Sequence, residues 1–222
     1  MGTSNWQNIS YNIGLLRKLD PHSILDVGVG FGRWGILFRE FLEIWDGGRY
    51  DGKWQRVING VEIFPGYLKD YHRYFYNVLF TGDALDYLQN ADITYDLINC
   101  GDVIEHMDKE RGEEFIKLAL EKSKYVLINI PIGTHWKQGG TDANPYEAHR
   151  SVWYNNDFTK YQFHKIKSFK DLTKRDFSVV LLSNNKIRFT KKFGRYFGLK
   201  NFLKHTLGLR RIVEKIERIR KK

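Results

Sequence analysis

A short segment of the sequence gathers side chains that can bind or move a proton. Asp102, Glu105 and His106 fall within five residues, directly after an apolar run. If this segment turns helical, Asp102 and Glu105 share one face. Two further histidines follow, His135 and His149, and His135 lies on the loop after an expected strand. Because an imidazole titrates near neutral pH, His106, His135 and His149 are candidate general bases.

A second segment combines glycines at a spacing that suits ligand binding. Gly28, Gly30, Gly32 and Gly35 directly follow the apolar run 24–27. Glycine permits a positive φ and lets a ligand approach the backbone closely. Apolar residues then resume with helical spacing, and the first N–H groups of a helix point toward whatever occupies such a turn. We therefore expect a strand, a glycine turn and a helix that together bind a nucleotide-like ligand.

The elements that must position these residues alternate between strand and helix patterns. Alternation with short links is typical of a parallel sheet with helices on both faces. The sequence therefore predicts an α/β fold, a Rossmann-like, doubly wound and mostly parallel sheet of about seven strands, followed by a C-terminal basic helical extension. We expect strands at 23–27, 57–62, 77–81, 95–100, 125–130, 167–172 and 177–182, and helices at 8–19, 33–45, 66–75, 84–89, 109–122 and 156–162.

The glycine turn fits two nucleotide-binding patterns. In one frame, Gly30-x-Gly32-x-x-Gly35 matches the fingerprint that binds NAD or FAD, a pattern that is weak evidence by itself. In the other frame, Asp26 precedes Gly28, Gly30 and Gly32 at every second position. This frame resembles motif I of the class I S-adenosylmethionine (SAM)-dependent methyltransferases.

Four further segments, the last of them 125–133, resemble the same family in the same order along the chain. Glu62 ends one expected strand, where the resemblance implies that its carboxylate accepts the ribose hydroxyls. Asp83 ends the next, where the resemblance implies a hydrogen bond to the adenine amino group. Segment 96–107 ends the strand after that, and it resembles the family's segment beside the methionine moiety of SAM. Taken singly, Glu62 and Asp83 also fit helix N-caps. The resemblance implies that SAM is the cofactor and that it is bound by Asp26, Gly28, Gly30, Gly32, Glu62, Asp83, Ala84, Gly101 and Asp102.

The proton-binding segment resembles, in part, the metal-dependent small-RNA 3′-terminal 2′-O-methyltransferases. Asp102, Glu105, His106 and His149 match the places where that group holds a divalent ion. The resemblance implies a cation such as Mg²⁺ or Mn²⁺, which mixed carboxylate and imidazole ligands suit. At the first of these positions the chain has Asp102 rather than a glutamate, and the shorter side chain places its carboxylate less far from the backbone. In the alternative without a metal, His106, His135 or His149 acts as the base, or the segment caps a helix.

The acceptor is less well defined by the sequence. An Asn/Asp-Pro-Pro-aromatic segment, expected in methyltransferases of nucleic-acid base amines, is replaced by "GDVIEH". The loops 47–56 and 135–146 are rich in aromatic and polar residues, which suit a sugar or another polyhydroxyl compound. We expect O-methylation of a small-molecule or glycan acceptor. The alternatives are an RNA 2′-O-methyltransferase, an NAD-dependent oxidoreductase and a non-catalytic, membrane-associated binding module.

The charge of the chain is concentrated at its C-terminal end. The net charge is +10, and segment 186–222 holds 14 of the 36 basic residues but only 2 of the 26 acidic residues. We therefore expect a methyltransferase domain at 1–185 and a basic amphipathic helical tail at 186–222, which contacts an anionic membrane surface or a partner helix rather than nucleic acid. The single cysteine, Cys100, is expected to be a buried small residue. The expected location is cytoplasmic or peripheral at a membrane, because no secretory signal or spanning segment is evident.

Overall fold

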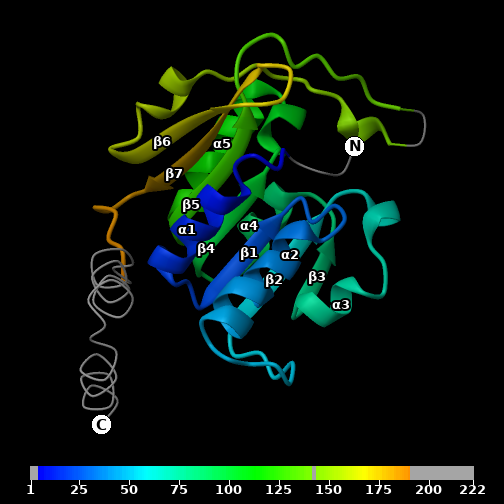
Figure 1. The fold of residues 1–222 in the computed structure, drawn as a ribbon. Coiled ribbons are helices and arrows are strands. Elements are labelled where there is room, and N and C mark those ends of the chain that lie inside the picture. The colour runs from blue at the N-terminus through cyan, green and yellow to red at the C-terminus, as the bar shows by residue number, and fades with distance from the viewer. Residues whose placement is uncertain (1–4, 142–143, 191–222) are drawn as a thin grey trace. The chain divides into compact units, whose positions relative to one another are not determined.

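A seven-stranded sheet forms the centre of the computed structural model, which describes residues 5–141 and 144–190 (Figure 1). The strand order is β3-β2-β1-β4-β5-β7-β6. Strands pair in parallel from β3 to β5, whereas β7 runs antiparallel to both β5 and β6. The predicted α/β fold with a mostly parallel sheet is confirmed. The strands are β1 (Ser23–Val27), β2 (Val57–Glu62), β3 (Val78–Thr81), β4 (Tyr95–Gly101), β5 (Ser123–Pro131), β6 (Phe163–Lys170) and β7 (Asp176–Ser183).

Helices cover both faces of the sheet, as a doubly wound arrangement requires. Figure 1 shows α1 and α2 in front of the sheet and α4 and α5 behind it. The central strands are buried on both faces, and Leu25, Ile98 and Ile128 are each 0% exposed. This explains why these strands read as continuous apolar runs rather than alternating ones. The helices are α1 (Ile9–Leu19), α2 (Arg33–Phe38), α3 (His72–Phe75), α4 (Ala84–Asn90) and α5 (Lys109–Glu121).

The predicted helix 33–45 changes its winding half-way. Arg33–Phe38 is α-helical, and Arg39–Trp45 continues as a π-helix. Arg39 is buried and donates hydrogen bonds to Phe75 O and Arg56 O at 2.8 and 2.9 Å, and it pairs with Glu43 at 3.3 Å. The change of winding coincides with this buried charged pair, an arrangement that an apolar periodicity does not encode.

Three other predicted boundaries are wrong. Expected helix 66–75 is split into a 3₁₀ turn at Pro65–Tyr67 and α3, because Leu68 between them has an extended backbone with ψ 130°. The expected helix 156–162 is a 3₁₀ turn at Asn155–Phe158. Strand β6 begins at Phe163, where its pairing with Ser183 of β7 starts, instead of at 167.

The predicted basic tail, 186–222, lies almost wholly outside the described residues. Its amphipathic helix and its membrane or helix partner therefore remain predictions. Within the described parts of the chain, each helix is too short or too polar to cross a membrane.

Candidate functional site

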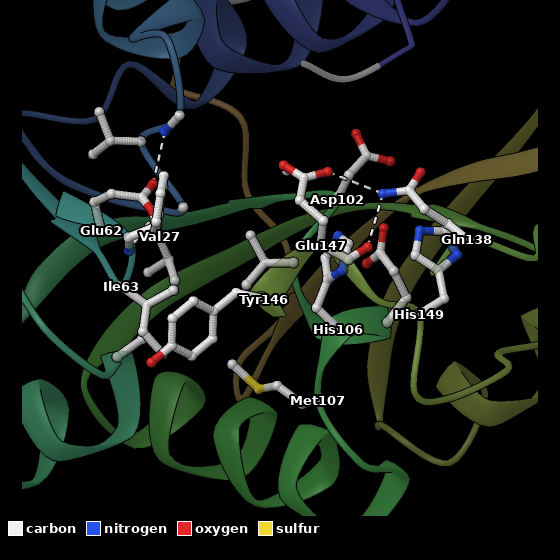
Figure 2. Close-up of a pocket in the computed structure, with 18 of the residues that line it drawn as sticks. Val27, Glu62, Ile63, Asp102, His106, Met107, Gln138, Tyr146, Glu147 and His149 are labelled. Carbon is white, nitrogen blue, oxygen red and sulfur yellow. Dashed lines mark hydrogen bonds between the residues drawn. The ribbon is translucent and has the colours of Figure 1, made fainter. Parts of the chain in front are cut away.

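A cavity of about 690 Å³ opens at the carboxyl ends of the central strands. Its wall includes the last residues of β1, β2, β4 and β5, namely Val27, Glu62, Gly101 and Pro131. The strand order changes direction between β1 and β4, and open α/β sheets bind ligands in the crevice at such a switch point. Figure 2 shows Glu62 at one side of this cavity and His106 and His149 at the other.

The glycine turn forms one wall of the cavity. Gly28, Gly30 and Gly32 have φ values of 74°, 53° and 79°, a left-handed conformation that side chains disfavour. A Cβ at Gly28 would also lie 2.4 Å from a methyl group of Val103. Gly28 and Gly30 line the cavity, whereas Gly32 precedes α2 and packs against His72.

Glu62 is fixed at the cavity wall by two backbone amides. Gly30 N donates to Oε2 and Phe64 N donates to Oε1, each at 2.8 Å. The side chain is 5% exposed, and this burial raises its pKa, while the two amides oppose the shift. Each oxygen retains a further lone pair, so the carboxylate can accept two more hydrogen bonds from a ligand.

Asp26 lies beneath the glycine turn rather than in the cavity wall. Tyr76 Oη donates to Asp26 Oδ2 at 2.5 Å, and Asn99 Nδ2 donates to Oδ1 at 2.8 Å. Tyr76 Oη in turn accepts from Gly35 N at 3.1 Å. Complete burial raises the pKa of Asp26 to about 7. The geometry therefore links Asp26, through Tyr76, to the start of α2, so that it supports the turn from below.

Asp83 and Ala84 line the cavity where β3 leads into α4. Asp83 is the N-cap of α4, and its Oδ1 accepts from Leu85 N at 2.8 Å. The same oxygen pairs with Arg111 at 2.9 Å. The alternative that Asp83 is a helix N-cap therefore agrees with its local contacts. Arg111 also lines the cavity and was not predicted from the sequence.

The proton-binding residues meet at the other side of the cavity. One ligand atom each of Glu105, His106 and His149 lies within 4.8 Å of the other two. The imidazole rings of His106 and His149 meet edge to face, with centroids 4.9 Å apart. Glu105 is 2% exposed, and both of its carboxylate oxygens are buried without a hydrogen-bond partner among the described residues. We call these three residues the Glu-His-His cluster.

Both histidines of the cluster present the same ring nitrogen. His106 Nδ1 lies 3.1 Å from Ala148 O, and His149 Nδ1 lies 2.6 Å from Trp136 O. A carbonyl oxygen can only accept, so each Nδ1 carries the proton and each Nε2 carries a lone pair. Burial lowers the pKa of His106 to about 4 and also lowers that of His149. Both rings are therefore neutral at physiological pH.

Backbone hydrogen bonds bring the two parts of the cluster together. Glu105 O accepts from Arg150 N at 2.8 Å and from Ser151 N at 3.1 Å. The loop between β5 and β6 is anchored nearby by Trp153, which is 1% exposed and stacks on Phe158. These contacts hold His149 beside His106, although the two residues lie on either side of β5 in the sequence.

The remaining predicted residues take different positions. Asp102 and Gly101 line the cavity, and Asp102 has a left-handed backbone with φ 52°. Asp102 lies outside the Glu-His-His cluster, but its charge contributes to the raised pKa of Glu105. His135 is exposed and does not line the cavity. Cys100 is fully buried, as expected.

Trp34 is a second cavity residue that sequence reasoning missed. It is 4% exposed, and its Nε1 is buried with no hydrogen-bond partner among the described residues. A Cβ at residue 101 would lie 2.5 Å from this nitrogen, so the indole fits only because Gly101 has no side chain. A buried indole N–H normally has an acceptor, and a lone one beside a cavity indicates a ligand or water.

Comparison with solved structures identifies the architecture. A SAM-dependent methyltransferase from Archaeoglobus fulgidus has a TM-score of 0.57 at 17% identity, over 79% of this chain and 91% of that one. The chain has the class I methyltransferase fold. The O-methyltransferase TomG from Streptomyces achromogenes, involved in tomaymycin synthesis and solved with SAM, gives a TM-score of 0.56 at 13% identity over 82% of both chains.

A third similar structure is the methyltransferase domain of bacterial CtHen1-C. It has a TM-score of 0.51 at 17% identity, over 81% of this chain and 98% of that one. No protein-family model matches the sequence, and a search of curated proteins finds no relative. At these identities the methyltransferase likeness is one of fold.

Proposed function

We propose that this protein is a SAM-dependent methyltransferase that methylates an oxygen of a small-molecule or glycan acceptor. The observation that carries the proposal is the carboxylate of Glu62, held by Gly30 N and Phe64 N at the ends of β1 and β2. A fixed carboxylate with free lone pairs at this place fits a ribose diol. When bound, SAM supplies an electrophilic methyl group on its sulfonium.

Trp34 fits the other end of the same cofactor. Its N–H, which has no partner within the described part of the chain, lies against Gly101 at the crevice between β1 and β4. The amino-acid end of SAM carries a carboxylate, which is a strong acceptor for such a donor. We infer that Glu62 holds the ribose and that the Trp34 indole N–H donates to this carboxylate.

The topology argues against the dinucleotide alternative. NAD-binding folds of the same class have the order 3-2-1-4-5-6, whereas here the antiparallel β7 is inserted between β5 and β6. Isothermal titration calorimetry with S-adenosylhomocysteine and with NAD tests the choice. We expect binding of S-adenosylhomocysteine; binding of NAD alone would reject the proposal. The non-catalytic alternative predicts binding without transfer to any acceptor.

The Glu-His-His cluster is proposed as the part that prepares the acceptor hydroxyl. Its donor set fits a divalent ion such as Mg²⁺ or Mn²⁺, because two neutral imidazoles lie close to a buried carboxylate that has no hydrogen-bond partner among the described residues. Such an ion lowers the pKa of a bound hydroxyl. Burial and the charge of Asp102 raise the pKa of Glu105, and a cation would favour its charged form.

Without a cation, the chain itself offers a proton acceptor. The proton of the acceptor hydroxyl would pass to His149 Nε2, because Nδ1–H is committed to Trp136 O. His106, with its pKa near 4, is too weak a base for this role near neutral pH and suits a ligand better. A methyl-transfer assay with and without a chelator distinguishes the two mechanisms.

A further inference from the structure

We propose that Lys137 and Arg150 form a subsite for an anionic oxygen group, a carboxylate or a phosphate, on the acceptor. This inference rests on the proposed function and adds the chemical class of the acceptor. Its starting point is that both cations line the same cavity as the Glu-His-His cluster, and both are exposed.

Backbone hydrogen bonds bring the segments that carry the two cations together at His149. Gln138 O accepts from His149 N at 2.9 Å, so the segment that carries Lys137 runs beside the segment that carries Arg150. Arg150 N is in turn bonded to Glu105 O at 2.8 Å. The two cations therefore lie on segments that adjoin the Glu-His-His cluster, in the wall of the same cavity.

Two acidic residues of the same wall, Asp83 and Glu147, have other partners. Asp83 pairs with Arg111. Glu147 accepts from Gln138 Nε2 at 3.0 Å and from the Tyr67 hydroxyl. No ion pair of Lys137 or Arg150 is found among the described residues.

Another cation in the wall, Arg175, already has an anionic partner. The Arg175 guanidinium lies 3.9 Å from the Trp136 ring centroid and pairs with Asp171 at 2.8 Å. Among the described residues, Lys137 and Arg150 are thus cations of this wall without an ion-pair partner, and the buried carboxyl group of Glu105 also lacks one. Two like charges in one cavity repel each other, and a bound anion removes that repulsion.

The two features together define the acceptor. One hydroxyl must reach the Glu-His-His cluster while an anionic group reaches Lys137 and Arg150. Both groups must fit in the space that the cofactor leaves in a cavity of about 690 Å³. A small hydroxylated acid or a sugar phosphate satisfies these conditions, because it carries both groups on a compact frame.

The test follows the labelled methyl group into whichever compound accepts it. The full-length protein is incubated with SAM carrying a tritiated methyl group and a deproteinised small-molecule extract of the producing organism. The products are then separated by anion exchange. We expect the label in the retained, anionic fraction. Phosphatase treatment distinguishes the two sources, since a phosphate product then becomes neutral and a carboxylate product stays anionic.

Variants connect the charge of the product to the proposed subsite. Lys137→Ala and Arg150→Ala should each raise the apparent KM for the active fraction about tenfold with little change in kcat, as expected when a charged contact made equally in the ground and transition states is lost. Lys117→Ala, which removes an exposed lysine outside the cavity, is the matched control. Binding of S-adenosylhomocysteine should be unchanged in all three.

Two results would overturn the subsite. The label could elute with neutral compounds, or both subsite variants could keep the KM of the wild type. Absence of label from every fraction, together with intact binding of S-adenosylhomocysteine, would instead reject the proposed methyl transfer and the subsite with it.

Discussion

His106 and His149 meet edge to face, with ring centroids 4.9 Å apart, and each ring donates its Nδ1 proton to a backbone carbonyl. Each ring therefore keeps a lone pair on Nε2, and one ring nitrogen of each histidine lies within 4.8 Å of a carboxylate oxygen of Glu105. This relationship makes the cluster a site for either a divalent ion or a proton.

The first prediction concerns the Glu-His-His cluster. If a divalent ion is held, a chelator should abolish methyl transfer, and Mg²⁺ or Mn²⁺ should restore it. His106→Ala and Glu105→Gln should each then lose most of the activity, because each removes a ligand. If His149 Nε2 is the base, activity should survive the chelator in the wild type and fall in His149→Ala.

The control for this assay is His22→Ala, which changes an exposed histidine outside the cavity. Full activity in the His106, His149 and Glu105 variants, with and without chelator, would remove the cluster from catalysis. It would then be a packed junction between the β5–β6 loop and the segment after β4.

The second prediction uses the burial of Asp26. Its pKa is about 7 in the folded protein against 3.8 for the ordinary side chain. Between pH 3.8 and about pH 7 the folded state therefore holds a proton that the unfolded state has released. The stabilising contribution of protonated Asp26 is complete below pH 3.8 and is lost as the pH rises through about 7. The amide side chain of Asp26→Asn does not titrate, so the stability of this variant lacks that pH dependence.

We expect the free energy of unfolding of Asp26→Asn to rise relative to that of the wild type between about pH 4 and about pH 8. The gain should amount to a few kcal/mol, since one pKa unit corresponds to about 1.4 kcal/mol. Urea unfolding at each pH measures it, and Asp92→Asn, at an exposed position, is the control. A constant difference between Asp26→Asn and wild type across this range would contradict the account.

The third prediction concerns the indole N–H of Trp34. Trp34→Phe removes the donor and keeps an aromatic ring in the core. Affinity for S-adenosylhomocysteine should fall about tenfold or more, the range for a hydrogen bond to a charged group. Affinity for 5′-methylthioadenosine, which lacks the amino-acid end, should stay the same.

Trp45→Phe, at an exposed tryptophan, serves as the control for general effects of this substitution. If Trp34→Phe weakens both ligands equally, its role is structural packing against Gly101. If it weakens neither, the indole N–H does not contact the cofactor.

The strands, and the turn that follows β1, could be predicted from the sequence because the patterns that encode them are local. The apolar run of β1 and the glycines after it predict a strand, a turn and a helix, and the positive φ values at Gly28, Gly30 and Gly32 follow from the lack of a side chain. The strand boundaries of β1 and β2 agree with the prediction to the residue. Short apolar runs and a helical period of 3.6 predict such elements directly.

Other features depend on contacts between distant segments, which a periodic pattern does not contain. The π-helical winding at Arg39 coincides with its bonds to Phe75 and Arg56. Tyr76 was not predicted as the partner that keeps Asp26 below the turn. The resemblance to a metal-dependent group did propose His106 with His149, and the structure brings them together with Glu105 but leaves Asp102 outside the cluster.

The central claim is that Glu62 binds the ribose of SAM in this cavity, and calorimetric binding of S-adenosylhomocysteine tests it most directly. The wild type should bind, and Glu62→Ala should lose about 1.5–3 kcal/mol of binding free energy, the range for hydrogen bonds to a charged group. The control Glu121→Ala, at an exposed end of α5, should bind like the wild type. An unchanged dissociation constant in Glu62→Ala, or no binding of S-adenosylhomocysteine by the wild type, would contradict the account.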